Sequence, residues 1–305
     1  MTPPALARRP RAAGAAPAAA EWLGLHLFYH GDRDRLLVEL VGPCVEGMLR
    51  DGLIRRFFWI RYNLGGPHVR LRLEVEPAHA RAAAARVHAD AEAFFRRAPS
   101  TATQPDDVVR RRNRGIVPSD RFAAGQEDVV FADHSVAELP VQLEVDRYGG
   151  AAVLEHSLGF FALSSAVALG FVAAHRHLPA AERLAGAVRM LVRQARGYAD
   201  DGAELVRLLG YALPPAGRQS PYVAAADAAF ATQGDALRRV LRSELDSDPL
   251  PELALGARDL SSALRGCARR EAIGASHLHM TANRLGLTNR EEIYLSRLMV
   301  LAAED

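Results

Sequence analysis

Residues 57–76, FFWIRYNLGGPHVRLRLEVE, form the stretch that decides the fold, because they contain two extended runs around a turn. Residues 57–62 are aromatic and apolar, and residues 63–67 combine Asn, two Gly and Pro, which are typical of a tight turn. Residues 68–76 alternate strictly between apolar and polar side chains. The stretch therefore predicts a β-hairpin whose second strand has one apolar face and one charged face.

The segments around this hairpin predict an α+β fold. Residues 21–30 are rich in Leu and aromatic side chains, as in a strand, and residues 34–49 have apolar side chains at helical spacing. Residues 78–97 predict a second helix. The order β-α-β-β-α predicts a split, ferredoxin-like sheet region at the N-terminal end, with helices packed on a mostly antiparallel sheet.

A polar segment, residues 99–128, follows the sheet region and is predicted to be a long loop. Its run Arg110-Arg111-Arg112 is either solvated or locally paired, or it contacts an acidic peptide. Residues 139–148 are predicted to be extended and to end at Gly149-Gly150.

The second half of the chain is predicted to be mainly helical. The expected helices cover residues 151–175, 180–210, 221–245, 253–285 and 288–304. Thr288-Asn289-Arg290-Glu291 is a capping-box sequence that marks the start of the last helix. We expect a disordered tail over residues 1–20 and one domain over residues 21–305, with a sheet part to about residue 148 and a helical part from about residue 149.

The basic side chains restrict the chemistry, because all 38 are arginines and the chain contains no lysine. Lysine Schiff-base, P-loop and lysine general-base mechanisms are therefore excluded, and arginine or histidine must hold any anion. The net charge of +2 predicts no nucleic-acid or membrane partner. We find no signal peptide and no apolar span of 18 residues, and we expect a soluble, cytoplasmic protein.

Several common cofactor and metal motifs are missing from the sequence. It contains no GxSxG, no GxGxxG after a strand, no P-loop, no HExxH and no CxxC, so we expect no cofactor and no metal. Cys44 and Cys267 lie in apolar segments predicted to be helical. We therefore expect two buried, inert thiols.

The charged face of the hairpin is the first candidate site, and its candidate substrate-binding side chains are Arg61, His68, Arg70 and Arg72. Spacing of two residues places the Arg70 and Arg72 guanidinium groups about 7 Å apart along the strand. Each can form a fork on a carboxylate or a peptide carbonyl. The alternative is a solvent-exposed polar face with Glu74 and Glu76 as salt-bridge partners.

Residues 276–284, SHLHMTANR, form the second candidate site. On a helix, Ser276, His279 and Asn283 share one face and His277 points elsewhere. Two histidines at i and i+2 are not a helical metal pair, which argues against metal binding. A lone histidine on a helix is more often structural, but the polar stripe favours a functional His279.

Residues 146–150, DRYGG, form the third candidate site, with Arg147 and Tyr148 in a charged, aromatic turn. The alternative is a turn that begins a helix and needs the φ freedom of glycine. Tyr294 on the last predicted helix is a further possible proton donor, or else a core residue with a hydroxyl partner.

Five ordered motifs together resemble one family. The motifs are residues 22–31 (WLGLHLFYHG), 57–62 (FFWIRY), 66–73 (GPHVRLRL), 147–150 (RYGG) and 279–286 (HMTANRLG). Over about residues 22–305 the chain resembles the thiopeptide-type bacteriocin biosynthesis domain, which is the lantibiotic dehydratase C-terminal domain in stand-alone form.

This resemblance implies two chemistries. In lantibiotic dehydratases the domain eliminates glutamate from glutamylated Ser or Thr to leave a dehydroamino acid. Some stand-alone relatives instead are thiopeptide pyridine synthases, which join two dehydroalanines by a formal 4+2 aza-cycloaddition and then lose water and the leader peptide. Elimination members use paired strand arginines, a further arginine before RYGG and the histidine of HM…NR.

The residues favour the cyclase over the elimination lyase. Arg70, Arg72 and His279 match the elimination pattern, but Leu143 occupies the place of the further arginine, and Thr281 stands where a second His is frequent. An arginine that steadies departing glutamate matters for elimination and little for cyclisation.

In a cyclase, we expect His279 and Tyr294 to move protons, with Ser276 as a further catalytic residue on the helix of His279. Arg61, His68, Arg70, Arg72, Arg147, Tyr148 and Asn283 are the candidates for holding the substrate. The expected partner is a ribosomal precursor peptide with a leader and a dehydrated, azole-bearing core. A third hypothesis is a non-catalytic escort that binds the leader.

Overall fold

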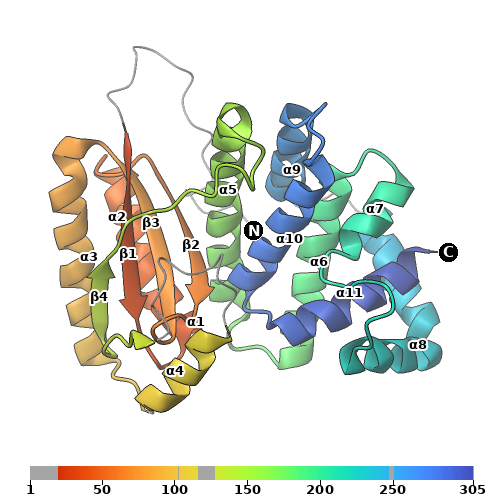
Figure 1. Ribbon diagram of the computed structural model, residues 1–305, viewed down its shortest axis with the longest axis horizontal. Coiled ribbons are helices and arrows are strands. Elements are labelled where there is room, and N and C mark those ends of the chain that lie inside the picture. Colours follow the sequence, from red (N-terminus) through yellow and green to blue (C-terminus); the bar gives the residue numbers. More distant parts are fainter. Residues whose placement is uncertain (1–19, 102, 116–127, 247–250, 305) are drawn as a thin grey trace. The chain divides into compact units, whose positions relative to one another are not determined.

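The computed structural model describes residues 20–101, 103–115, 128–246 and 251–304. The chain divides into two compact units, of which the first ends at Leu143 and the second begins at Glu144. The first contains the sheet and the second is helical (Figure 1). The predicted change from sheet to helices was at about residue 148. The predicted tail lies outside the described residues except for residue 20, and the single-domain expectation stays a prediction.

The first unit is built on a four-stranded antiparallel sheet. Its strands are β1 (Glu21–Phe28), β2 (Arg56–Tyr62), β3 (His68–Val75) and β4 (Ser135–Glu138). Their spatial order is β2-β3-β1-β4, and every neighbouring pair is antiparallel. The hairpin of β2 and β3 is present as expected, and the ferredoxin-like α+β prediction is confirmed.

Helices cover the apolar face of this sheet. They are α1 (Arg33–Leu36), the π-helical turn η2 (Leu37–Val41), α2 (Gly42–Arg50) and α3 (Pro77–Arg97). Figure 1 shows α2 and α3 on one side of β1 and β3. Leu27 and Val69 face each other across the strands on this side and are at most 1% exposed. Burying each such side chain is worth about 1.5–3 kcal/mol, so this layer holds the unit together.

The prediction of a loop over residues 99–128 is wrong in part, because Asp106–Arg114 forms helix α4. Acidic residues in its first turn and arginines in its last turn suit the helix dipole. Arg110 and Arg111 pair with Asp106 and Asp107 at i−4, so for these two arginines local pairing is confirmed. Residues 116–127 lie outside the described part of the chain.

The last strand also differs from the expectation of an extended segment over residues 139–148. The strand is β4, Ser135–Glu138, because these residues pair with Leu25–Phe28 of β1. Residues 145–149 form turns instead.

The second unit is helical, as expected, but contains more helices than the periodicity predicted. They are α5 (Ala151–His175), α6 (Ala180–Tyr198), α7 (Gly202–Leu209), α8 (Pro221–Asp246), α9 (Pro251–Ala263), α10 (Arg270–Leu285) and α11 (Asn289–Ala303). The helix predicted over 180–210 is divided, because the Asp201 side chain accepts a hydrogen bond from Glu204 N and caps α7. The helix predicted over 253–285 is divided by turns at residues 264–269, where Gly266 disfavours helix.

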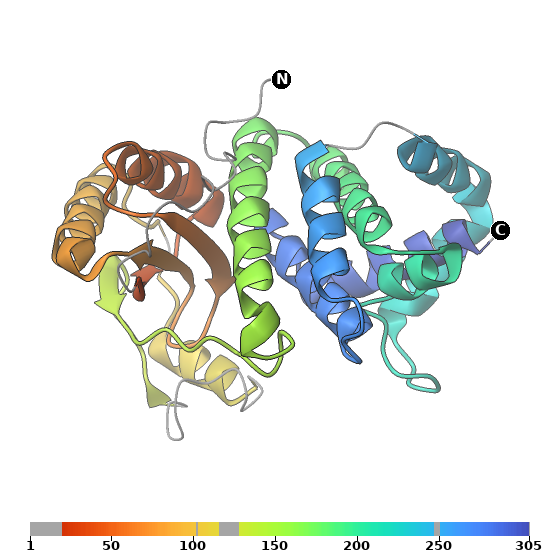
Figure 2. The same cartoon turned by 90° about the horizontal axis from the view of Figure 1, so that it is seen from above.

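Helix α5 corrects the expectation that the chain has no long apolar span. Among the described residues, it is long and apolar enough by length and composition to cross a membrane. However, 56% of its most apolar 18-residue stretch is buried in the structure. Helices α9 and α10 of the same unit pack against it, so its composition fits a core helix (Figure 2).

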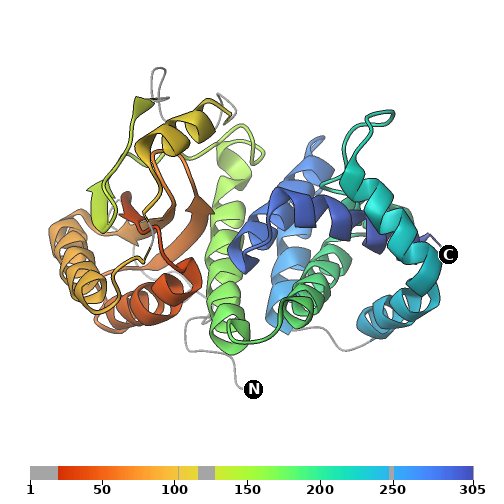
Figure 3. The same cartoon turned by 90° about the horizontal axis from the view of Figure 1, so that it is seen from below.

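A short connection joins the last two helices and positions the candidate site. Gly286 ends α10 with φ +88°, a left-handed conformation that a residue with a Cβ adopts at a cost of about 1–2 kcal/mol. Thr288 then begins α11 through the predicted capping box with Glu291. Helix α11 packs along α8 (Figure 3). In the sequence, the first turns of α11 come shortly after the end of α10. The short connection therefore returns the chain toward the middle of α10.

Candidate active site

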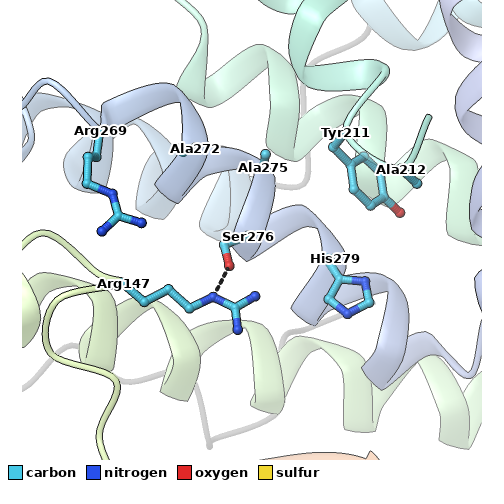
Figure 4. A pocket seen from close by; sticks show the side chains of 8 residues that line it. All are labelled: Arg147, Tyr211, Ala212, Arg269, Ala272, Ala275, Ser276 and His279. Carbon is cyan, nitrogen blue, oxygen red and sulfur yellow. Dashed lines mark hydrogen bonds between the residues drawn. The ribbon is translucent and has the colours of Figure 1, made fainter. Parts of the chain in front are cut away.

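A pocket of about 330 Å³ in the second unit gathers polar side chains from several segments. Its lining residues are Arg147, Tyr211, Ala212, Arg269, Ala272, Ala275, Ser276 and His279. Figure 4 shows Arg147 and Arg269 at one end, Tyr211 and His279 at the other, and Ser276 between them. Alanines on α10 leave the space open. Arg147, Ser276 and His279, which were predicted from separate motifs, thus lie in one site.

The His279 imidazole is paired with a buried carboxylate. Its Nδ1 lies 2.8 Å from an Oε atom of Glu292, whose side chain is 2% exposed, whereas the His279 side chain is 39% exposed. Glu292 lies in the first turn of α11, where the helix dipole favours negative charge. A histidine oriented by a carboxylate is a common arrangement for proton transfer, because the carboxylate sets the tautomer and stabilises the imidazolium.

The Tyr211 hydroxyl lies beside the same carboxylate. Burial raises the pKa of Tyr211 well above its usual value, and the negative charge of Glu292 raises it further. This hydroxyl therefore stays protonated at neutral pH and can donate a hydrogen bond.

Arginines line the other end of the pocket and are oriented by hydrogen bonds. The Arg147 Nε donates to Ser276 Oγ at 2.9 Å, and its NH1 contacts the Glu144 carboxylate at 3.1 Å. Arg269 donates from NH1 to the backbone oxygen of Asp146 at 2.8 Å. Guanidinium groups of this kind can hold peptide carbonyls or carboxylates.

Arg147 and Tyr148, which precede a glycine pair, have side chains in different environments. Gly149 and Gly150 have φ +91° and +89°, as expected for a turn that needs glycine before a helix. Arg147 lines the pocket, but Tyr148 is 3% exposed and packs edge-on against Phe161 at 5.0 Å. Burial also raises the pKa of Tyr148. Tyr148 is therefore a core residue in this structure.

The histidines of α10 point to different environments, as the helical spacing predicted. His277 is 1% exposed, packs on Phe161 at 4.6 Å between ring centroids, and has its Nε2 3.1 Å from Ser157 Oγ. Burial lowers the pKa of His277 to about 3, with Arg284 and Arg147 contributing. His277 is thus a neutral core histidine, and His279 is the one in the pocket.

Asn283 and Tyr294 are not among the side chains that line the pocket. Asn283 is half-buried one turn beyond His279 on α10. Tyr294 is half-buried on α11, two residues after Glu292. Within the described ranges, Tyr211 therefore takes the place in the pocket that was expected for Tyr294.

The charged face of the β-hairpin lies in the first unit. The alternative that this face is exposed to solvent is wrong. His68, Arg70 and Arg72 are 0%, 7% and 8% exposed. The Arg70 guanidinium carbon lies 3.4 Å from the centroid of the Tyr62 ring, and that of Arg72 lies 5.4 Å from the centroid of Phe58. Cation–π stacking on the neighbouring strand thus accompanies both arginines.

Glutamates at the end of this strand were the expected partners, but their carboxylates pair with other arginines. Glu74 pairs with Arg56, and Glu76 pairs with Arg55 at 3.0 Å. The physical reason is proximity, because Arg56 lies directly opposite Glu74 in the β2–β3 register.

Arg61 and His68 are also placed differently from the prediction. Arg61 lies opposite Val69 and therefore on the other face of the hairpin from Arg70, where it pairs with Asp34 at 2.6 Å. His68 stacks on His26 with ring centroids 5.0 Å apart. Burial lowers its pKa far below the usual value, and the charge of Arg70 lowers it further. His68 is thus a neutral packing residue.

The sequence reasoning missed Tyr211, Arg269 and Glu292. Arg269 precedes α10, and Tyr211 lies in the turn after α7, so no motif pointed to either residue. Glu292 had a partial signal, because Gly286 and the capping box indicate a short connection between α10 and α11. Within the described segments, no three His, Cys, Asp or Glu side chains come together as metal ligands.

Comparison with solved structures shows that two proteins share this fold over nearly the whole chain. The pyridine synthase TbtD from thiomuracin biosynthesis has a TM-score of 0.76 at 17% identity, over 92% of this chain and 97% of that chain. TsrL has a TM-score of 0.55 at 18% identity, over 94% of this chain and 95% of that chain.

A larger protein contains the same fold as one part. The tRNA-dependent lantibiotic dehydratase MibB from Microbispora sp. 107891 has a TM-score of 0.57 at 20% identity, over 95% of this chain but only 28% of that chain. A comparison with curated protein sequences gives no significant match. The sequence matches the family described as lantibiotic biosynthesis dehydratase C-term over residues 22–303. The chain therefore belongs to the lantibiotic dehydratase C-terminal family, as the five motifs indicated.

Proposed function

We propose that this protein is a pyridine synthase that matures a ribosomally made thiopeptide precursor. Membership of the family supports an enzyme that acts on such a peptide. The pocket with the His279–Glu292 pair carries the proposal, because the reaction consists of proton transfers and positioning. The fold shared with the thiomuracin pyridine synthase, with a TM-score of 0.76, adds support.

The reaction requires no oxidant. One dehydroalanine amide moves its N–H proton to oxygen and becomes the iminol of a 2-azadiene. Two carbon–carbon bonds then form to the second dehydroalanine, and the N=C double bond of the new ring appears. Loss of water and of the leader as a carboxamide, with two ring protons, leaves the pyridine and the macrocycle.

The pocket residues match these needs. His279 would move the iminol and ring protons, and Ser276 and Tyr211 would supply hydroxyl donors. Arg147 and Arg269 would hold peptide carbonyls so that the alkenes lie face to face. Positioning of this kind is worth up to about 7–11 kcal/mol, and general acid–base catalysis adds about 10²- to 10⁴-fold.

The partner under this proposal is a precursor peptide with a leader and a dehydrated, azole-bearing core. We expect the reaction to run in the cytoplasm without nucleic acid or membrane. The cavity of about 330 Å³ accommodates the two reacting residues and not a whole peptide, so the remaining peptide would bind outside it.

A second candidate function is glutamate elimination from glutamylated Ser or Thr. The observation in its favour is the arginine pair in the pocket, which suits the carboxylates of a departing glutamate. A base would remove the Cα proton, the C–O bond would break, and the alkene would form as glutamate leaves. Leu143 in place of the arginine expected before RYGG weighs against this candidate.

The test is incubation of the purified protein with a synthetic leader-bearing peptide that contains two dehydroalanines, without tRNA or added metal. Mass spectrometry should detect a macrocycle that has lost water and a released leader carboxamide. No change in this peptide, together with loss of glutamate from a glutamylated Ser peptide, would overturn the proposal in favour of the lyase. If neither peptide changed while the protein bound the leader, the non-catalytic leader-binding escort would gain support.

A further inference from the structure

We infer that Glu292 is a positioning residue that holds His279 with the proton on Nδ1, so that Nε2 is the nitrogen that exchanges protons with the substrate. The part of this inference that concerns the rate rests on the proposed function. The part that concerns the tautomer does not, because it is a property of the protein alone.

The contact geometry is the first support. Nδ1 of His279 and an Oε atom of Glu292 are 2.8 Å apart, which is the distance of a charge-assisted hydrogen bond. An ionised carboxylate only accepts hydrogen bonds, so Nδ1 must carry the proton. Nε2 then has a lone pair in the neutral ring. A ring held this way can take a proton from an amide N–H or a ring carbon and return it later.

Burial of the carboxylate is the second support. Glu292 is 2% exposed, and glutamate is almost never this buried without partners. The side chain that it meets is the half-exposed His279 in the pocket wall. Glu292 lies in the first turn of α11, where the helix dipole favours negative charge and offsets part of the cost of burying it.

Tyr211 provides the third support, because it is a second titratable group beside the same carboxylate. Its hydroxyl stays protonated, so it adds no negative charge next to Glu292. His279 and the Tyr211 hydroxyl, a hydrogen-bond donor, therefore lie at the same end of the pocket (Figure 4).

The local sequence offers a matched control. Glu291 and Glu292 are neighbours in the first turn of α11, and both add negative charge to the same helix end. Glu291 faces Thr288, whose backbone N it contacts at 2.7 Å, and has no part in the pocket lining. Glu291→Gln therefore removes the same charge from the same turn and keeps a residue suited to a capping box.

The deciding measurement is the ¹⁵N spectrum of the histidine-labelled protein, at a pH at which the rings are neutral. His279→Gln identifies the signals of His279. In the unchanged protein and in Glu291→Gln we expect one tautomer, protonated on Nδ1. In Glu292→Gln we expect a mixture, because the amide can either accept from Nδ1 or donate to it. The same Nδ1-protonated tautomer in all three proteins would overturn the inference.

The rate gives the second readout. We expect Glu292→Gln to lower kcat about 100-fold with little change in KM, and Glu291→Gln to leave both within about 2-fold. Glu292→Asp, which keeps a carboxylate, should recover part of kcat and most of the Nδ1 tautomer. If Glu292→Gln fails to fold, Glu292→Asp still tests whether the carboxylate sets the tautomer. If KM and kcat of the Glu292 variants changed only in proportion to the loss of thermal stability, and the tautomer stayed the same, Glu292 would have a merely structural role.

The two proposals fail in distinguishable ways. If the protein eliminates glutamate and does not cyclise, the spectrum still reports the tautomer, and the same variants are then compared on the glutamylated peptide. If the protein cyclises but the tautomer does not depend on Glu292, the proposed function stands and this inference falls.

Discussion

The Nε of Arg147 donates a hydrogen bond to the Oγ of Ser276 at 2.9 Å, and this bond joins the turn before α5 to the middle of α10. It links two motifs that lie 129 residues apart in the sequence. Because Ser276 precedes His279 by nearly one helical turn, the same bond also fixes the position of Arg147 relative to the imidazole.

Arg147→Lys is expected to lower kcat/KM about 10-fold with little loss of stability. A single ammonium group cannot reproduce the planar fork that contacts Ser276 and Glu144 together. Glu144→Gln is the matched control, since it removes an exposed ion pair worth at most about 1 kcal/mol and keeps the bond to Ser276. Steady-state kinetics on the precursor peptide would check both. Equal effects of the two variants would show that the ion pair, and not the bond to Ser276, is what matters.

Gly286→Ala is expected to destabilise the second unit by about 1–2 kcal/mol. The residue has φ +88°, and a Cβ in this left-handed conformation is strained. Because Gly286 connects α10 to α11, the His279–Glu292 distance should also become less well defined. Chemical denaturation checks the stability.

A second glycine in the same unit offers the control for this change. Gly159 lies within α5, where an added Cβ would meet nothing within 4 Å. Gly159→Ala should therefore stabilise by about 0.5–1 kcal/mol. Destabilisation of similar size at both positions would contradict the role given to the conformation of Gly286.

The free energy of unfolding of the second unit is expected to fall as the pH drops below about 6.5, because of His277. Its pKa is lowered to about 3 in the folded state by burial and by the neighbouring Arg284 and Arg147, whereas in the unfolded chain it is near 6.5. Between these values only the unfolded state takes up the proton, so acid favours unfolding. The expected slope is about 1.4 kcal/mol per pH unit.

Denaturation at pH 5.0, 5.5, 6.0 and 7.5 would measure this dependence, in a range where carboxylates contribute little. His277→Gln should reduce the slope between pH 5 and 6.5 by about 1.4 kcal/mol per pH unit, while the buried His68 keeps its own contribution. His156→Gln should not, because His156 on α5 is exposed. An unchanged slope in His277→Gln would show that another group takes up the proton.

Thiol reactivity should separate the two cysteines. Cys44 is 3% exposed, and burial raises its pKa to about 12, so it should react only when the protein unfolds. Cys267 is half-buried in the turns between α9 and α10, which corrects the expectation that both thiols lie buried in helices. One thiol per chain should therefore react quickly with an aromatic disulfide reagent. Cys267→Ser should abolish this fast phase, and a fast phase that survives would contradict the assignment.

Local patterns predicted the elements well, because they depend on neighbours in the chain. The alternation of residues 68–76 and the turn before them predicted the β2–β3 hairpin. The capping box predicted the start of α11 at Thr288. Among the helices of the second unit, the failures were at breaks in continuous helical periodicity, such as the one at Asp201, because apolar spacing continues across a short break.

The sequence by itself determined the α+β order, the β-hairpin, the start of the last helix and the family, since these follow from periodicity, capping chemistry and ordered motifs. Only the tertiary structure decided which side chains share the pocket. Spacing along α10 separates His279 from His277, but it says nothing of the carboxylate on α11 or the hydroxyl of Tyr211 that meet His279 there. Burial of Arg70 and Arg72 likewise depends on what covers the sheet face, and alternation alone cannot distinguish a solvated polar face from a covered one.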